Sequence, residues 1–306
     1  MRTTVLTGLV LGGVLWMSGL VASVAPALAQ AKDPTLAQAK DPALVQTKGA
    51  EKQDAEYRAG KNFIPTRAYS PQEDQEVLRL FEGLRVADVS DGMDAAGLQD
   101  IGLVSPDIRP LWRDTEHYTH RFVGIAVTAR YVPTNKPSAG HQKTEDFDRW
   151  VGRWYSELSP EPFVPLLRRG TALVIEDCQS VDVGTIGSNN IMGWKLRGCV
   201  GVVTSATARD TDEITTERMP LYFQRPGRGI RPGRNEIESV NRPVVVGGVL
   251  VVPGDVIVAD GDGVIVVPRR AAEEVARYAR AILDGDKAGR RGLYKKLGLP
   301  PDDSVK

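Results

Sequence analysis

The residues best suited to chemistry are one arginine and three carboxylates in a short stretch of chain. The apolar run Val200–Thr204 is followed by Arg209 and Asp210, and then by Asp212 and Glu213. Arginine binds a substrate carboxylate through a planar fork of donors. Closely spaced carboxylates are oxygen ligands for a hard divalent cation. The stretch therefore predicts a metal-assisted reaction on a small carboxylic acid.

Within this stretch, Asp210 and Glu213 are the candidate metal ligands. On a helix their spacing of three residues places them on one face, whereas Asp212 would point to solvent. Mg²⁺ is held by one or two carboxylates and several waters, so one direct ligand and one water-holding carboxylate would suffice. The alternative is an acidic first turn of a helix, which the helix dipole favours without any metal.

A glycine-containing loop upstream is the candidate substrate-binding loop. Residues 184–190 precede a helix, so the free amides of Gly187, Ser188, Asn189 and Asn190 are suited to bind an anion. In a strand–helix–strand unit this loop and Arg209 lie at the same sheet edge. The alternative is that the glycines only form a turn and that Arg209 makes a surface ion pair.

Alternating and continuous apolar runs predict the elements that position these loops. Ser70 opens a helix through a capping box, and a second short helix is expected to begin near Ser90. The expected strands are 122–132, 173–177, 200–204, 244–252, 256–259 and 263–267, with helices ending near Arg197 and covering 271–283. This order indicates a layered α/β domain.

Residues 134–165 interrupt the pattern and are interpreted as an insertion with a helix over 147–158, either covering the site or packing as a surface helix. The arginine cluster at 225–234 is expected to serve loop structure or subunit contacts. Cys178 and Cys199 either pair or stay as buried free thiols.

The N-terminal part has the composition of an export signal and a tether. Residues 1–29 carry an early arginine, an apolar run and an Ala-Leu-Ala cleavage site, which predict a cleaved signal peptide, a periplasmic or secreted protein and no stable membrane span. Residues 30–68 contain a repeated Lys-Asp-Pro unit and are expected to form a flexible linker. Residues 69–306 form the folded domain. With 39 basic and 39 acidic residues, no nucleic-acid partner is expected.

Taken in order, these segments resemble the RraA-like family, which includes 4-hydroxy-4-methyl-2-oxoglutarate aldolase and regulators of ribonuclease E activity. The resemblance spans 70–283, and its most specific part is the Arg-Asp-x-x-Glu pattern that begins at Arg209. The other matching pieces are 89–91, 122–128, the stretch from Gly187 to that pattern, 243–248 and 253–268.

The resemblance implies a single domain with a layered β/β/α fold of the swivelling-domain type, assembled as trimers or hexamers with sites between subunits. It also implies a class II pyruvate aldolase or oxaloacetate decarboxylase, which cleaves a 2-oxo acid through a pyruvate enolate stabilised by Mg²⁺ or Mn²⁺. By this resemblance Arg209 binds pyruvate, Asp210 binds the metal, Glu213 orders metal-bound water, and amides around Gly187 hold the substrate. The alternative within the family is a non-catalytic binding or regulatory protein.

Overall fold

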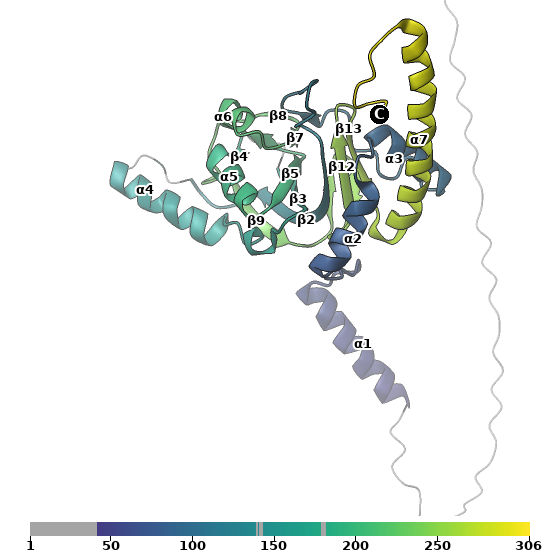
Figure 1. Cartoon of the computed structure of the whole chain (residues 1–306). Coiled ribbons are helices and arrows are strands. Elements are labelled where there is room, and N and C mark those ends of the chain that lie inside the picture. The colour runs from purple at the N-terminus through teal and green to yellow at the C-terminus, as the bar shows by residue number, and fades with distance from the viewer. Residues whose placement is uncertain (1–41, 139, 141–142, 179–181) are drawn as a thin grey trace, which may run out of the picture. The chain divides into compact units, whose positions relative to one another are not determined.

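The computed structural model describes residues 42–138, 140, 143–178 and 182–306 (Figure 1). The expected signal peptide, 1–29, lies outside the described residues. The chain divides into two compact units, Met1–Lys61 and Asn62–Lys306. Among the described residues, no helix has both the length and the hydrophobicity needed to cross a bilayer.

The described part of the smaller unit contains one helix, α1 (Pro42–Ala59). Part of the stretch expected to form a flexible linker, residues 30–68, is thus helical, and its flexibility stays a prediction. Pro42 is suited to the first helical position, and the Ala, Gln, Glu and Lys residues after it favour a helix. Every side chain from residue 50 to residue 59 is exposed.

The larger unit is built on a mixed, nearly closed eight-stranded sheet. The main path runs β1-β7-β5-β3-β2-β12-β13, and β9 pairs with the second half of β2. Strands β2, β3, β5 and β7 are parallel, whereas β1, β9, β12 and β13 join antiparallel. The bounds are β1 (Arg109–Pro110), β2 (Phe122–Pro133), β3 (Thr171–Glu176), β5 (Cys199–Thr204), β7 (Leu221–Phe223), β9 (Asn235–Val240), β12 (Val256–Asp260) and β13 (Gly263–Val267).

Both faces of the central strands are buried. Along β3, Leu173 and Ile175 enter one hydrophobic core, while Ala172 and Val174 enter another. Successive side chains of a strand point to opposite faces, so a continuous apolar run indicates a strand covered on both sides. The predicted α/β layered fold is confirmed.

Three helices cover β12 and β13 on one side: α2 (Pro71–Phe81), α3 (Val86–Ala95) and α7 (Ala272–Leu297). The capping box predicted at Ser70 is present, with Glu73 as its partner. Helix α3 begins a turn before the expected Ser90, because Asp88 accepts the backbone N–H of Arg85 at 2.9 Å and caps the helix there. Helix α7 continues well beyond 283.

The expected strand 244–252 is wrong, because it is a hairpin of β10 (Val244–Val246) and β11 (Val249–Val251). Gly247 and Gly248 form its two-residue turn with φ values of 55° and 82°. Positive φ at both central positions is the turn geometry that matches the twist of paired strands, and glycine adopts it without strain.

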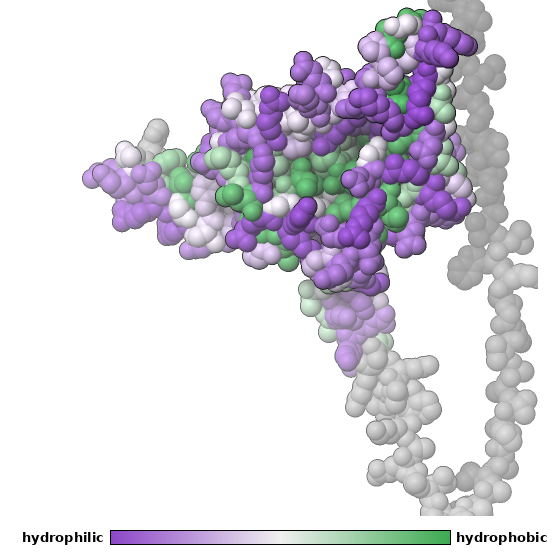
Figure 2. Space-filling view, in the orientation of Figure 1, coloured by the Kyte–Doolittle hydropathy of each residue, from purple (hydrophilic) through white to green (hydrophobic). Residues whose placement is uncertain are grey.

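The inserted segment contains helix α4 (Thr144–Arg153), a π-helical turn (Trp154–Leu158) and a 3₁₀ turn (Val164–Leu166). Helix α4 projects from the sheet and buries none of its residues. The hydrophobic surface on the drawn face gathers over the middle of the main sheet, whereas α2 and α4 are mostly hydrophilic (Figure 2). Cys178 and Cys199 are buried free thiols, which decides between the two alternatives left open.

Candidate functional site

A small parallel sheet brings the two candidate loops together. It consists of β4 (Gly184–Ile186), β6 (Thr207–Ala208) and β8 (Arg225–Pro226) in that order. The sequence predicts one loop over 184–190 and places Arg209 directly after the strand 200–204, whereas the structure has two additional short strands, β4 and β6, in these stretches. The Arg209 N–H donates to the Ile186 carbonyl at 2.8 Å. Because β4 and β6 are parallel, the segments that follow them emerge at the same edge.

The first loop residue, Gly187, caps helix α5 (Ser188–Leu196). Its N–H donates to Asn190 Oδ1 at 3.2 Å. The Ser188 N–H donates to Asp210 Oδ2 at 3.2 Å, and the Ser188 hydroxyl lies 3.5 Å from the same oxygen. The Asp210 carboxylate therefore lies at the positive end of a helix, where negative charge is stabilised.

The Arg209 side chain packs across Gly184 and ends beside Asp210. A methyl group on Gly184 would lie 2.7 to 3.0 Å from the Cβ, Cγ and Cδ atoms of Arg209, so only glycine leaves room for this side chain. Arg209 Nε lies 3.8 Å from Asp210 Oδ1, and the two side chains are 36% and 38% exposed. The guanidinium group and the carboxylate thus share an edge that solvent and a small ligand can reach.

Asp210 has an uncommon backbone conformation. Its φ of 56° and ψ of 41° are left-handed, and it forms the N-cap of α6 (Thr211–Thr216). Aspartate adopts this region more readily than most residues. The Asp210 carbonyl accepts the Ile214 N–H at 3.0 Å, which starts the helix and turns the chain sharply at the site.

Of the remaining predicted residues, Asn189, Asp212 and Glu213 are exposed. Asp212 and Glu213 occupy the first turn of α6. The Asn190 side chain turns away from Asp210, since its Nδ2 donates to Glu161 Oε1 at 2.6 Å. Of the four backbone amides predicted to bind a substrate, those of Gly187 and Ser188 already donate to Asn190 and Asp210, which leaves those of Asn189 and Asn190 for a ligand.

The donors at this edge fit a water-rich divalent site. Within the described ranges, no group of three or more His, Cys, Asp or Glu side chains converges as a metal cage would require. Mg²⁺ is usually held by one or two carboxylates and keeps several waters. Asp210 and Glu213, three residues apart at the start of α6, are the carboxylates that could serve in this way.

A largely buried polar network, which the sequence does not predict, lies behind the loop. Arg231, expected to serve the loop or a subunit contact, is 4% exposed within its own chain. Its Nη2 donates to Glu161, and its Nη1 donates to the Tyr131 hydroxyl at 3.1 Å. Burial would lower the pKa of Arg231, but Tyr131 and Glu161 raise it above the ordinary value. No sequence pattern links these residues.

A buried carboxylate, Asp177, adjoins the same network. Asn235 Nδ2 donates to both of its oxygens at 3.1 Å, and the Thr185 hydroxyl also donates to it. Burial raises the pKa of Asp177 in spite of these donors. Thr185 belongs to β4, so this cluster fixes the strand that leads into Gly187.

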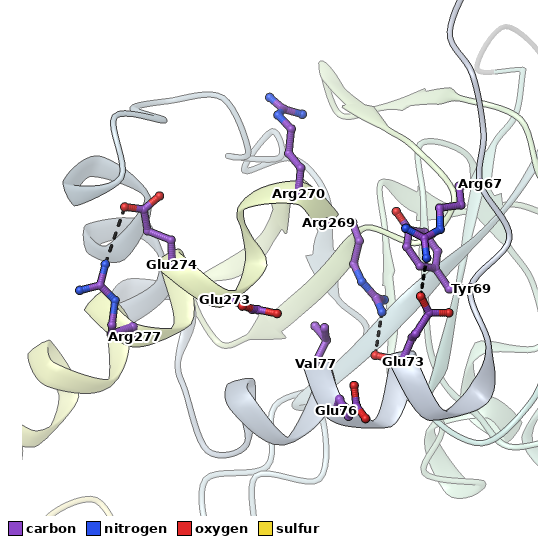
Figure 3. Close-up of a pocket in the computed structure, with 10 residues that line it drawn as sticks. All are labelled: Arg67, Tyr69, Glu73, Glu76, Val77, Arg269, Arg270, Glu273, Glu274 and Arg277. Carbon is purple, nitrogen blue, oxygen red and sulfur yellow. Dashed lines mark hydrogen bonds and ion pairs between the residues drawn. The ribbon is translucent and has the colours of Figure 1, made fainter.

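A larger cavity, of about 910 Å³, lies between α2 and the start of α7 (Figure 3). None of its ten lining residues belongs to the loops described above. Its charges pair locally, with Arg67 on Glu73 at 2.5 Å and Arg277 near Glu274 at 3.7 Å. We take the Arg209 edge as the candidate site instead, because the two loops predicted from the sequence meet there and Arg209 Nε lies 3.8 Å from Asp210 Oδ1.

The chain is similar to several known proteins. A family model described as RraA-like, Aldolase/RraA, matches residues 86–266. Protein DlpA of Legionella pneumophila is 28% identical over 236 residues, which cover 72% of this chain and 33% of DlpA. A putative 4-hydroxy-4-methyl-2-oxoglutarate aldolase of Halalkalibacterium halodurans is 28% identical over 123 residues, which cover 40% of this chain and 58% of that protein. The chain thus spans a third to three-fifths of these relatives.

Solved structures share the fold. A protein from Pseudomonas syringae pv. tomato superposes with a TM-score of 0.57 at 24% identity and covers 80% of this chain and 100% of its own. Streptomyces coelicolor RraAS2, titled an unusual member of the RNase ES inhibitor RraA protein family, superposes with a TM-score of 0.57 at 22% identity. That match covers 71% of this chain and 98% of RraAS2.

Proposed function

The chain belongs to the RraA-like family, and from that premise we propose that it is a divalent-metal-dependent lyase. The proposed reaction cleaves a carbon–carbon bond of a small 2-oxo acid, as an aldolase or an oxaloacetate decarboxylase does, and releases pyruvate. One observation carries the proposal: the Arg209 guanidinium group lies 3.8 Å from the Asp210 carboxylate, at a solvent-open edge beside the N-terminus of α5.

Each group at this edge has a role in that chemistry. Asp210, with Glu213 ordering water, would hold Mg²⁺ or Mn²⁺, which when bound supplies positive charge to the 2-oxo oxygen. Arg209 binds the substrate carboxylate as a fork of donors. The amides at the start of α5 orient the same carboxylate. Donors aimed at developing negative charge are worth about 10²- to 10³-fold in rate each.

The test is pyruvate release by the purified full chain from oxaloacetate and from 4-hydroxy-4-methyl-2-oxoglutarate, with Mg²⁺ and with EDTA. We expect turnover that EDTA abolishes and that Asp210→Asn lowers by at least about 10²-fold. Asp212→Asn is the matched control, because it removes an equally exposed carboxylate two residues away and should leave turnover intact. Equal turnover in EDTA, or full activity of Asp210→Asn, would refute the proposal.

A non-catalytic binding protein, like the regulators in the family, is the competing proposal, and it predicts no turnover on either acid. Its test is the same assay, since wild-type protein without metal-dependent pyruvate release would favour it.

We also propose a homotrimer or hexamer, exported to the periplasm or secreted. Val245 and Leu250, on the β10–β11 hairpin, are each 49% exposed, which supports an apolar contact surface between copies. Light scattering of the purified chain tests the assembly, and a monomer would overturn it. Fractionation of producing cells tests the export, and retention of the protein with an uncleaved N-terminus in the cytoplasm would contradict it.

A further inference from the structure

The inserted segment reaches the candidate site through one carboxylate, that of Glu161. Its Oε1 accepts Asn190 Nδ2 at 2.6 Å and also accepts Arg231 Nη2. Its Oε2 accepts Trp194 Nε1 at 2.9 Å. Two of these three donors belong to α5, so a residue of the insertion holds both the first and the last turn of that helix.

Arg231 holds Glu161 in place from the other side. Its Nη1 donates to the Tyr131 hydroxyl at 3.1 Å and to the Ser159 carbonyl at 3.0 Å. The rings of Tyr131 and Tyr155 flank the guanidinium group, with centroids 5.5 and 5.3 Å away. The side chains of Arg231 and Glu161 are 4% and 19% exposed. An ion pair this far from water is maintained only when its remaining hydrogen-bonding groups are satisfied, and the contacts above satisfy them.

Asn190 connects the Arg231–Glu161 ion pair to the loop. Because Nδ2 is held by Glu161, Oδ1 faces the Gly187 N–H, which it accepts at 3.2 Å. Gly187 in turn lies against the Asp210 carboxylate: a methyl group added to it would lie 2.8 Å from Oδ2. A continuous series of contacts therefore runs from Arg231 through Glu161 and Asn190 to the loop.

We propose that Glu161 and Arg231 are positioning residues, which fix the first turn of α5 so that its amides meet the substrate carboxylate. The insertion is then a built part of the binding site rather than a surface addition. The binding role rests on the proposed function, whereas the mechanical link from Glu161 to Gly187 does not. If α5 were held by its apolar packing alone, this link would be dispensable.

Hydrogen exchange measured by mass spectrometry tests the link without substrate, metal or turnover. Asn190→Ala removes the acceptor of the Gly187 N–H but leaves the Arg231–Glu161 pair, so the fold is retained. We expect amides at the start of α5 to exchange about tenfold faster, which corresponds to about 1.4 kcal/mol of local stability. Glu161→Gln, which removes the charge paired with Arg231, should have the same effect at the same peptide.

The matched control is Glu157→Ala, which removes an exposed glutamate of the same inserted segment and should leave exchange at α5 unchanged. Unchanged exchange at the start of α5 in both Asn190→Ala and Glu161→Gln would overturn the inference.

With active protein, Asn190→Ala should raise KM for oxaloacetate about tenfold and keep kcat within threefold, because it loosens binding of the carboxylate and not the reacting atoms. A fall in kcat at unchanged KM would contradict a positioning role. Wild-type protein without turnover would refute the proposed lyase, while the exchange experiment would still decide the link from Glu161 to Gly187.

Discussion

Substituting Gly187 by alanine is the most direct test of the site geometry. A methyl group there would lie 2.8 Å from Asp210 Oδ2 and 3.4 Å from Asn190 Oδ1. An ordinary contact begins near 3.4 Å, so the Asp210 carboxylate must move by about 0.6 Å. The hydrogen bond from the Ser188 N–H is already 3.2 Å long, and a shift of that size away from the loop breaks it.

The backbone tolerates this change. Gly187 has φ −126° and ψ 170°, an extended conformation that alanine adopts freely. Alanine is a poorer N-cap than glycine, and we expect the free energy of unfolding to fall by about 1 kcal/mol or less. A misplacement of about 1 Å can lower a rate by about 10²-fold, and here the shift also breaks the hydrogen bond that orients the carboxylate. The expected variant is therefore a folded protein with about 1% of the wild-type kcat/KM.

The assay is Mg²⁺-dependent pyruvate release, accompanied by urea denaturation. Gly193→Ala is the matched control, because Gly193 lies exposed in the same helix with nothing within 4 Å of the added methyl group. That control should keep full activity and gain up to about 1 kcal/mol of stability from helix propensity. If Gly187→Ala kept kcat/KM within threefold of wild type, the lack of a side chain at Gly187 would not be what makes room for the Asp210 carboxylate.

Three further predictions concern other groups. Arg209→Lys replaces a fork of donors by a point charge, and we expect kcat/KM to fall more than tenfold while Mn²⁺ binding, measured by electron paramagnetic resonance, is kept. Burial raises the pKa of the Cys178 thiol to about 12 and that of Cys199 to about 11, so a thiol reagent at pH 8 should label neither cysteine in the native protein and both in urea. Burial lowers the pKa of His120 below 6.5 in the folded protein. As pH falls, this histidine is therefore protonated in the unfolded chain before it is protonated in the folded one. The free energy of unfolding, measured in urea, should then decrease below pH 6.5 by up to about 1.4 kcal/mol per pH unit, and His120→Asn should flatten that slope.

The elements that could be predicted from sequence are those with long apolar runs. The sequence predicts strands β2, β5, β12 and β13 nearly in full, because a strand buried on both faces has a nearly continuous run of hydrophobic residues. Strands β4, β6 and β8 have two or three residues each. Such short strands leave no periodic pattern, and tertiary contacts decide them.

The residues of the candidate site also differ in whether the sequence can predict them. Arg209 and the Gly187 loop could be paired in advance, because both follow strand-like segments in one strand–helix–strand unit. Glu161 could not, since its partners Asn190 and Arg231 lie 29 and 70 residues away. A buried ion pair between distant segments depends on the complete fold and has no local signature.

The left-handed backbone of Asp210 has a consequence for natural variation at that position. With φ at 56° and ψ at 41°, only glycine, asparagine and aspartate are accommodated at little cost. Of these three, aspartate alone carries a negative charge. If Asp210 holds the metal as we propose, a relative that lost the activity can exchange this aspartate for asparagine or glycine without straining the backbone.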